Sequence, residues 1–219
     1  GQVPSYVPTD SLVGWWPFCG DANDLSGNGH NGTINGATLV NDRFGTTNNA
    51  YSFSGDDDIT IGISSIPSLE NQSEITFSAW IKKTVWSQGG SQGRIISYED
   101  LNNVSTKGTA LQIQNSGFSI TKSIQCDARN GANTVGAAYR IDTTTVWHHI
   151  AMVFDGNATT NNNKLKLYVD GVLYALIPFI NSNYPQITHN GTAILKFGNR
   201  VTNSTSNAIY GYGGQIDDI

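Results

Sequence analysis

Charged residues are scarce in this sequence. Lys, Arg, Asp and Glu make up 13% of its 219 residues, which is low for a cytosolic enzyme. The polar surface must therefore come from Asn, Thr, Ser, Gly and Gln, whose side chains suit turns and loops. This composition indicates a protein that is secreted or displayed at the cell surface.

Clustered basic residues and long apolar runs are also lacking. The chain has 12 Lys and Arg residues, which are scattered, and a net charge of −5. A surface that binds nucleic acid needs clustered basic side chains that release counterions from the phosphates, so the sequence argues against a nucleic-acid partner. No apolar run approaches the ~20 residues of a membrane-spanning helix, so no membrane span is expected.

The chain has only two cysteines, Cys19 and Cys126. In a secreted protein, two cysteines this far apart are commonly joined, and a bridge would imply an oxidising compartment. We therefore predict a Cys19–Cys126 disulfide, with two buried free thiols as the alternative.

Catalytic and zinc-binding patterns are missing. A glycosidase needs a pair of carboxylates flanking the scissile bond, but none of the three glutamates, Glu70, Glu74 and Glu99, has an acidic residue two positions away. The adjacent pair His148-His149 would point to opposite faces of a strand, so the two rings cannot share one zinc ion. The sequence therefore predicts no enzymatic activity, although a lyase site of Gln, His, Tyr and Arg has no motif by which it could be recognised.

What the chain does contain is a series of short β-branched and aromatic stretches, separated by Gly, Asn, Ser and Thr. Many short strands at near-regular spacing predict an all-β sandwich or barrel, and only Ser65–Gln72 resembles a helical turn. The expected strands are Leu12–Phe18, Gly32–Val40, Ala50–Phe53, Ile59–Ile63, Ile75–Lys83, Arg94–Tyr98, Ala110–Gln114, Phe118–Ile124, Val135–Ile141, Trp147–Phe154, Lys164–Val169, Val172–Ile177, Ala193–Gly198 and Gln215–Ile219.

One hairpin is nearly explicit in the sequence. Lys164–Val169 alternates polar and apolar residues, Asp170-Gly171 supplies the two residues of a tight turn, and Val172–Ile177 returns. Trp147–Phe154 carries apolar residues on both faces, which predicts a central strand.

Three groups of motifs occur in a characteristic order. The first is Leu12–Phe18 with Asp24–Thr33, the second is Trp147–Ala151 with Phe154–Gly156 and Leu167–Gly171, and the third is Gly214–Ile219. Together, and with Ser78–Lys82 as the second core strand, they resemble the bacterial laminin G-like domains of the concanavalin A-like lectin/glucanase superfamily.

The resemblance implies a jelly-roll β-sandwich of two curved antiparallel sheets, formed as a single domain over residues 1–219. In such domains the last strand returns beside the first. Here that strand is apparently truncated at Ile219, so we expect the domain to belong to a larger multidomain protein.

A calcium site is also expected, mainly from the resemblance. Calcium prefers several oxygen ligands, and it often combines carboxylates with backbone carbonyls. Asp24 opens a glycine-containing loop, and the strand with Asp217 and Asp218 is implied to run beside Leu12–Phe18, which would bring the acidic segments together. Asp217 is favoured over Asp218, since adjacent strand residues face opposite sides; a turn-forming Asp24 and solvated strand-end charges are the alternative. The expected metal-site residues are Asp24, Asn28, His30, Asp217 and Asp218.

Binding of a carbohydrate needs planar aromatic rings together with side chains that bond to hydroxyls. Trp15, Trp16, Trp80 and Trp147 are assigned to the core because they lie in the strand motifs. The candidate ligand-binding residues are Trp86, Tyr98, Arg129, Tyr139, Asn199, Arg200, Tyr210 and Tyr212.

The favoured interpretation is an extracellular, calcium-stabilised binding module that is lectin-like and binds carbohydrate. An adhesion module that contacts a protein or a neighbouring domain is the first alternative, and a polysaccharide hydrolase or lyase is the second. A fold shared by lectins, adhesion domains and enzymes does not choose among them.

Overall fold

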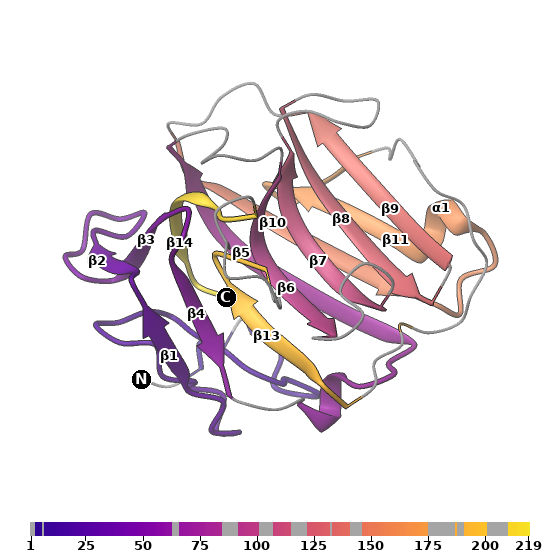
Figure 1. Ribbon diagram of the computed structural model, residues 1–219, viewed down its shortest axis with the longest axis horizontal. Coiled ribbons are helices and arrows are strands. Elements are labelled where there is room, and N and C mark those ends of the chain that lie inside the picture. Colours follow the sequence, from indigo (N-terminus) through magenta and orange to yellow (C-terminus); the bar gives the residue numbers. More distant parts are fainter. Residues whose placement is uncertain are drawn as a thin grey trace.

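The protein forms a sandwich of two β-sheets (Figure 1), which confirms the predicted all-β jelly roll. The computed structural model describes residues 3–5, 7–62, 66–84, 92–100, 107–114, 122–131, 133–140, 146–174, 187, 191–200 and 210–219. Within these residues each sheet has seven antiparallel strands. None of the described helices is long and apolar enough to span a membrane.

The first sheet, called sheet A, faces the viewer in Figure 1. In spatial order its strands are β1 (Gly32–Asn35), β4 (Asp58–Ile61), β13 (Ala193–Phe197), β6 (Gln92–Asp100), β7 (Lys107–Gln114), β8 (Ser123–Asn130) and β9 (Asn133–Arg140).

The second sheet, sheet B, lies behind it. In spatial order its strands are β12 (Val172–Tyr174), β11 (Leu165–Val169), β10 (His148–Asp155), β5 (Glu74–Lys83), β14 (Gly213–Asp217), β3 (Ala50–Ser54) and β2 (Thr38–Val40). The described helical elements are short: a 3₁₀ turn at Pro67–Leu69, within the predicted turn Ser65–Gln72, and the single turn α1 (Asn161–Lys164).

The core lies between the sheets because each strand buries every second side chain. On β5, Phe77, Ala79 and Ile81 are buried, whereas the residues between them are half-buried or exposed. This is the two-residue period of a strand with one face in the core. On β10, Ile150 and Met152 are fully buried, so the two central strands of sheet B contribute adjacent rows to the core.

The predicted hairpin is confirmed. Val169 pairs with Val172 across Asp170 and Gly171, whose φ angles of 51° and 77° are the positive values of a tight hairpin turn. The central position of β10 is also confirmed, because β10 pairs with β5 on one side and with β11 on the other.

The N-terminal motif differs from the prediction. Leu12–Phe18 forms no regular strand. Trp16 and Ile219 nevertheless exchange two backbone hydrogen bonds, with N–O distances of 2.9 and 3.1 Å. The end of the chain therefore lies beside the first motif, and the side chain of Trp16 is buried against Phe197.

The predicted disulfide is not formed. Cys19 and Cys126 are both free thiols, the first exposed and the second fully buried. Cys126 lies on β8, in the interior of sheet A, whereas Cys19 follows the motif that pairs with Ile219. The assumption that two cysteines of a secreted chain are joined therefore failed, because the fold places them in separate environments.

Candidate functional site

A cleft of about 710 Å³ lies between the N-terminal segment and strand β5, and we call it the β5 groove. The N-terminal segment contributes Val7–Pro8 and Asp10–Trp16 to its lining, and β5 contributes Glu74–Ser78 and Trp80. The lining also includes single residues from other parts of the chain, among them Arg43, His149 and Asp218.

The alternation of β5 explains which of its side chains are available to the groove. Because Phe77, Ala79 and Ile81 point into the core, Ser78 and Trp80 point to the outer face of sheet B, where they are half-buried. Trp80 lies opposite His149 on β10, and their ring centroids are 5.4 Å apart. The groove therefore contains the indole of Trp80, and the pairing of β5 with β10 fixes His149 beside it.

Arg43 is the second neighbour of Trp80. It lies in the turn between β2 and β3, and its guanidinium carbon is 4.9 Å from the centre of the Trp80 ring and 4.5 Å from that of Phe44. Arg43 also binds two carboxylates, Asp217 at 2.5 Å and Asp218 at 2.6 Å. Two ion pairs and two cation–π contacts thus hold one guanidinium group at the groove.

At this end of the groove, carboxylates outnumber guanidinium groups, because Arg43 pairs with both Asp217 and Asp218. Burial and the neighbouring Asp218 raise the pKa of Asp217 to about 6, and Arg43 only partly opposes them. Burial would lower the pKa of Arg43, but hydrogen bonds and charge from Asp218 and Asp217 raise it. Burial lowers the pKa of His149, so its ring is neutral at pH 7.

Four of the five residues expected to bind calcium have other partners. Asp24 accepts backbone hydrogen bonds from Trp15 and Ser26 through Oδ1, and from His30 through Oδ2, at 2.8–3.0 Å. Burial would raise the pKa of Asp24, but these hydrogen bonds lower it. The Asn28 amide donates to the carbonyls of residues 12 and 13. Both oxygens of Asp24 thus face N–H groups, as in the turn-forming alternative.

The other two expected ligands, Asp217 and Asp218, are bound to Arg43. Within the described part of the chain, no group of three or more His, Cys, Asp or Glu side chains could hold a metal ion. In this arrangement the cationic partner of the two C-terminal carboxylates is a guanidinium, and the calcium site stays a prediction.

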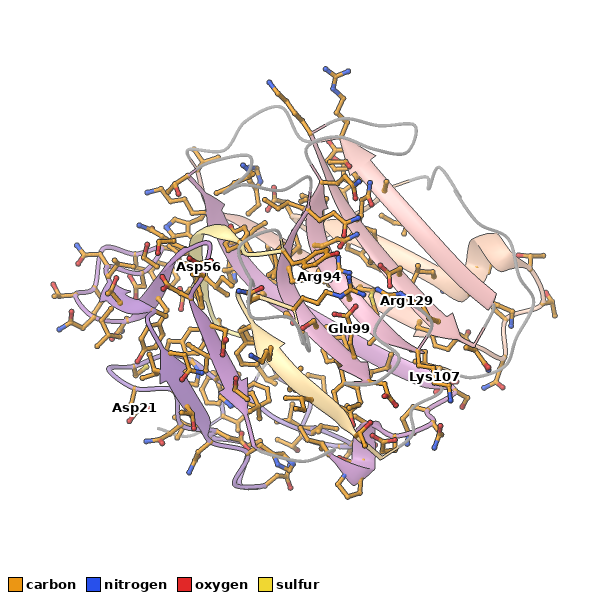
Figure 2. The ribbon with its side chains drawn as sticks, in the orientation of Figure 1. Asp21, Asp56, Arg94, Glu99, Lys107 and Arg129 are labelled. Atoms are coloured by element: carbon orange, nitrogen blue, oxygen red, sulfur yellow. The ribbon has the colours of Figure 1, made fainter. Side chains whose placement is uncertain are left out.

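Four of the eight expected ligand-binding residues gather around the other sheet. Figure 2 shows Arg94, Glu99 and Arg129 together over β6, β7 and β8, on the face of sheet A that is turned away from sheet B. We call this the polar face. Arg129 belongs to it directly, and Asn199, Arg200 and Tyr210 lie against it: the Asn199 carbonyl accepts a hydrogen bond from Ser97 and Arg200 contacts Glu99.

Glu99 is the centre of the ion pairs on the polar face. Its Oε1 lies 2.8 Å from Arg129 and 3.3 Å from Arg94, and its Oε2 lies 3.5 Å from Arg200. Burial would raise the pKa of Glu99, but the charges of the three arginines lower it. Glu99 is therefore ionised at neutral pH, which does not suit a general acid.

The remaining four residues lie elsewhere. Tyr98 and Tyr212 are fully buried in the core. Tyr139 is half-buried, and its ring lies 3.7 Å from that of Tyr174, between the two sheets. Trp86 lies outside the described residues.

Comparison with known proteins agrees with this architecture. A sequence profile described as the concanavalin A-like lectin/glucanases superfamily matches residues 53–219. The chain belongs to this superfamily. A comparison with curated protein sequences finds no significant match.

Several solved structures share the superfamily fold at low sequence identity. Domain 4 of AbnA, an extracellular arabinanase of Geobacillus stearothermophilus solved with arabinotriose, is 17% identical with a TM-score of 0.63, over 94% of this chain and 89% of that domain. The binding domain of Paraclostridial Mosquitocidal Protein 1 is 17% identical with a TM-score of 0.61, over 96% of this chain. A botulinum neurotoxin type C structure is 14% identical with a TM-score of 0.60, also over 96%. This chain spans about half of each toxin chain, 48% and 46%.

Sequence reasoning missed the principal residues of the β5 groove. Trp15 and Trp80 were assigned to the core, yet both line the groove. The sequence did contain a sign that one of these tryptophans lies outside the core, since Trp15 and Trp16 are adjacent in an extended segment and cannot both face inward. Arg43 had no comparable local signal, because its partners lie at the other end of the chain.

Proposed function

We propose that this chain is a lectin-like module that binds carbohydrate in the β5 groove without cleaving it. The observation that carries the proposal is the half-buried indole of Trp80 at the groove, with His149 and the guanidinium of Arg43 as neighbours. The apolar face of a sugar ring stacks on such an indole, while its hydroxyls need nearby donors and acceptors.

The groove supplies both kinds of contact. Trp15 and Trp80 offer aromatic surface, and the hydroxyls of Thr76 and Ser78 lie along the same strand as Trp80. A volume of about 710 Å³ lies within the usual range of small-molecule sites. These features favour a short oligosaccharide.

The relatives support the same class of ligand. One is a domain of an extracellular arabinanase bound to arabinotriose, and another belongs to a neurotoxin whose cell entry depends on gangliosides. By analogy we propose that this module acts outside the cell, as part of a larger protein that it directs to a glycan. Adhesion to a protein partner is the alternative that the experiment below distinguishes.

A glycan array on the purified chain, followed by calorimetry with the best glycan, tests the proposal. Trp80→Ala should weaken binding by about tenfold or more, because a central aromatic contact is lost. Thr76→Trp, which places a large ring on an exposed position of the groove without touching the core, should block it.

The control is Val172→Ala. Val172 is an exposed apolar residue on β12 that does not line the groove, so its truncation should leave the affinity unchanged. No binding to any glycan, or equal affinity for wild type and Thr76→Trp, would contradict the proposal and favour a protein ligand.

A further inference from the structure

Strand β5 continues beyond its neighbour β14, and part of its edge has no strand partner among the described residues. β14 pairs with β5 only from Trp80 to Lys83, whereas β5 begins at Glu74. No other described strand pairs with Glu74–Ala79 on this side, since β10 lies on the opposite one. At ~3.3 Å per residue, this open edge is about 17 Å long. It presents a row of main-chain donors and acceptors to which another strand could be added.

The β5 groove runs along this edge. A cleft over one face of a strand would be lined by alternate residues, because successive side chains face opposite sides. Here the consecutive residues Glu74–Ser78 all line the cleft. Ile75 and Phe77 belong to the core, yet each is 8% exposed, whereas Ala79 is fully buried. The inner part of the groove is therefore an apolar slot in the plane of sheet B, bounded by the edge of Glu74–Ser78, and we call it the β5 slot.

The opposite wall of the β5 slot is the N-terminal segment, which is held by a loop. The carbonyls of Leu12 and Val13 accept hydrogen bonds from the Asn28 amide at 2.8 and 3.0 Å. The N–H of Trp15 donates to Asp24 at 3.0 Å. Among the described residues no hydrogen bond joins this wall to β5. The slot can therefore admit a segment between the wall and β5 without breaking a described contact.

The charges at the slot indicate which kind of segment fits. Asp10, Glu74 and Asp218 line the groove, and Arg43 is the only lysine or arginine among its described lining residues. Asp218 is bound to Arg43. Asp10 and Glu74 form no ion pair with a described residue. A segment that carries a basic residue would therefore complement this rim.

We propose that the β5 slot binds an extended segment of a partner protein, which adds to β5 as a strand. The main chain of the segment pairs with the open edge, antiparallel to β5 and in line with β14. Its alternate apolar side chains contact Ile75 and Phe77, and a lysine or arginine lies near Glu74. Strand addition of this kind takes its affinity from main-chain hydrogen bonds and its specificity from alternate side chains.

The β5 slot and the proposed carbohydrate contacts lie on different sides of β5. A strand added in the plane of sheet B leaves Ser78 and Trp80 on the outer face, where the sugar ring is proposed to stack. Binding of a partner segment therefore goes beyond the proposed carbohydrate function and does not rest on it.

Calorimetric titration of the whole chain with a synthetic peptide tests the slot. The probe has about six residues, which matches the length of the open edge; valine alternates in it with lysine and threonine, and both ends are capped. Its fully N-methylated form keeps the side chains but lacks main-chain donors, so it should bind at least about tenfold more weakly. The unmethylated peptide should also slow hydrogen exchange of the amides between Glu74 and Ala79. Equal affinity for the two peptides, or no binding of the unmethylated one, would overturn the proposal.

Variants test the charge and the position of the peptide. Glu74→Lys should weaken peptide binding about two- to fivefold, the usual contribution of an exposed charge pair. Asp56→Lys makes the same charge change at an exposed residue that does not line the groove, and it should leave the affinity unchanged. Equal affinity for these two variants would overturn the proposal.

Two further results separate the β5 slot from other occupants. Trp80→Ala should leave peptide binding unchanged even where it weakens glycan binding, because the indole lies on the outer face. Loss of peptide binding by Trp80→Ala would place the peptide on the carbohydrate surface instead. Self-association of the chain in gel filtration that is reversed by the peptide would assign the slot to a second copy and overturn the partner assignment.

Discussion

Arg43 and Asp217 are 174 positions apart in the sequence and form an ion pair of 2.5 Å. This contact joins the turn between β2 and β3 to the end of β14. Since the same guanidinium lies over Trp80, the contact also fixes one wall of the β5 groove. The stability of the C-terminal strand and the shape of the groove therefore depend on one side chain.

Arg43→Ala should destabilise the protein by about 3–5 kcal/mol, the usual cost of removing one partner of a buried ion pair. Asp217 would be left buried with a second carboxylate beside it. Urea unfolding measures the loss, with Lys122→Gln, which removes an exposed cation, as the control. Equal midpoints for the two variants would show that the ion pair contributes little.

Stability should depend on pH through Asp217. Because its pKa is raised from 3.8 to about 6 in the folded state, the folded protein binds more protons than the unfolded chain between these values. Its contribution is therefore complete below pH 3.8 and is lost as the pH rises through about 6. Between pH 4 and pH 7 the wild type should lose up to about 3 kcal/mol relative to Asp217→Asn. Parallel stability curves for the two proteins would contradict the raised pKa.

Chelation distinguishes a guanidinium from calcium as the partner of the C-terminal carboxylates. A calcium ion shared by Asp24 and Asp217 would make the melting temperature fall when EDTA is added. We expect no change, because backbone N–H groups already bind both oxygens of Asp24 and Arg43 binds Asp217. A fall that is absent from Asp24→Ala and Asp217→Ala would support the calcium site predicted from the sequence.

The two thiols should differ in reactivity. Cys19 is exposed and should react with a thiol reagent in the native protein, whereas Cys126 is fully buried and should react only after unfolding. Burial also raises the pKa of Cys126, which disfavours the reactive thiolate. Titration of the denatured, unreduced protein should find two thiols. Finding none would show that the predicted disulfide forms after all.

The fold was more predictable than the site, for a physical reason. Strand position depends on a two-residue period that is visible in short segments, and the Asp170-Gly171 turn is encoded by the residues that form it. The same period, applied to β5, would have placed Trp80 outside the core, since Ala79 and Ile81 on either side of it are inside.

Long-range partners could not be deduced in this way. Arg43 has no motif, and its pairing with Asp217 exists only once β14 lies between β3 and β5. On the polar face, Arg129 and Arg200 were selected by residue type and do approach a common partner, Glu99. Glu99 and Arg129 are both in register with Gly108 on β7, and this alignment of three strands is not revealed by composition.

The position of β14 also bears on how the chain folds. Strands β2 and β3 come early in the sequence, but they join β5 only through β14, near the other end. Until β14 is inserted, one edge of β3 and one edge of β5 lack their partner in sheet B. Pairing between segments so far apart requires a large loop to close first, which slows folding. Sheet B is therefore completed late, and β3 and β5 present open edges to other chains during that interval.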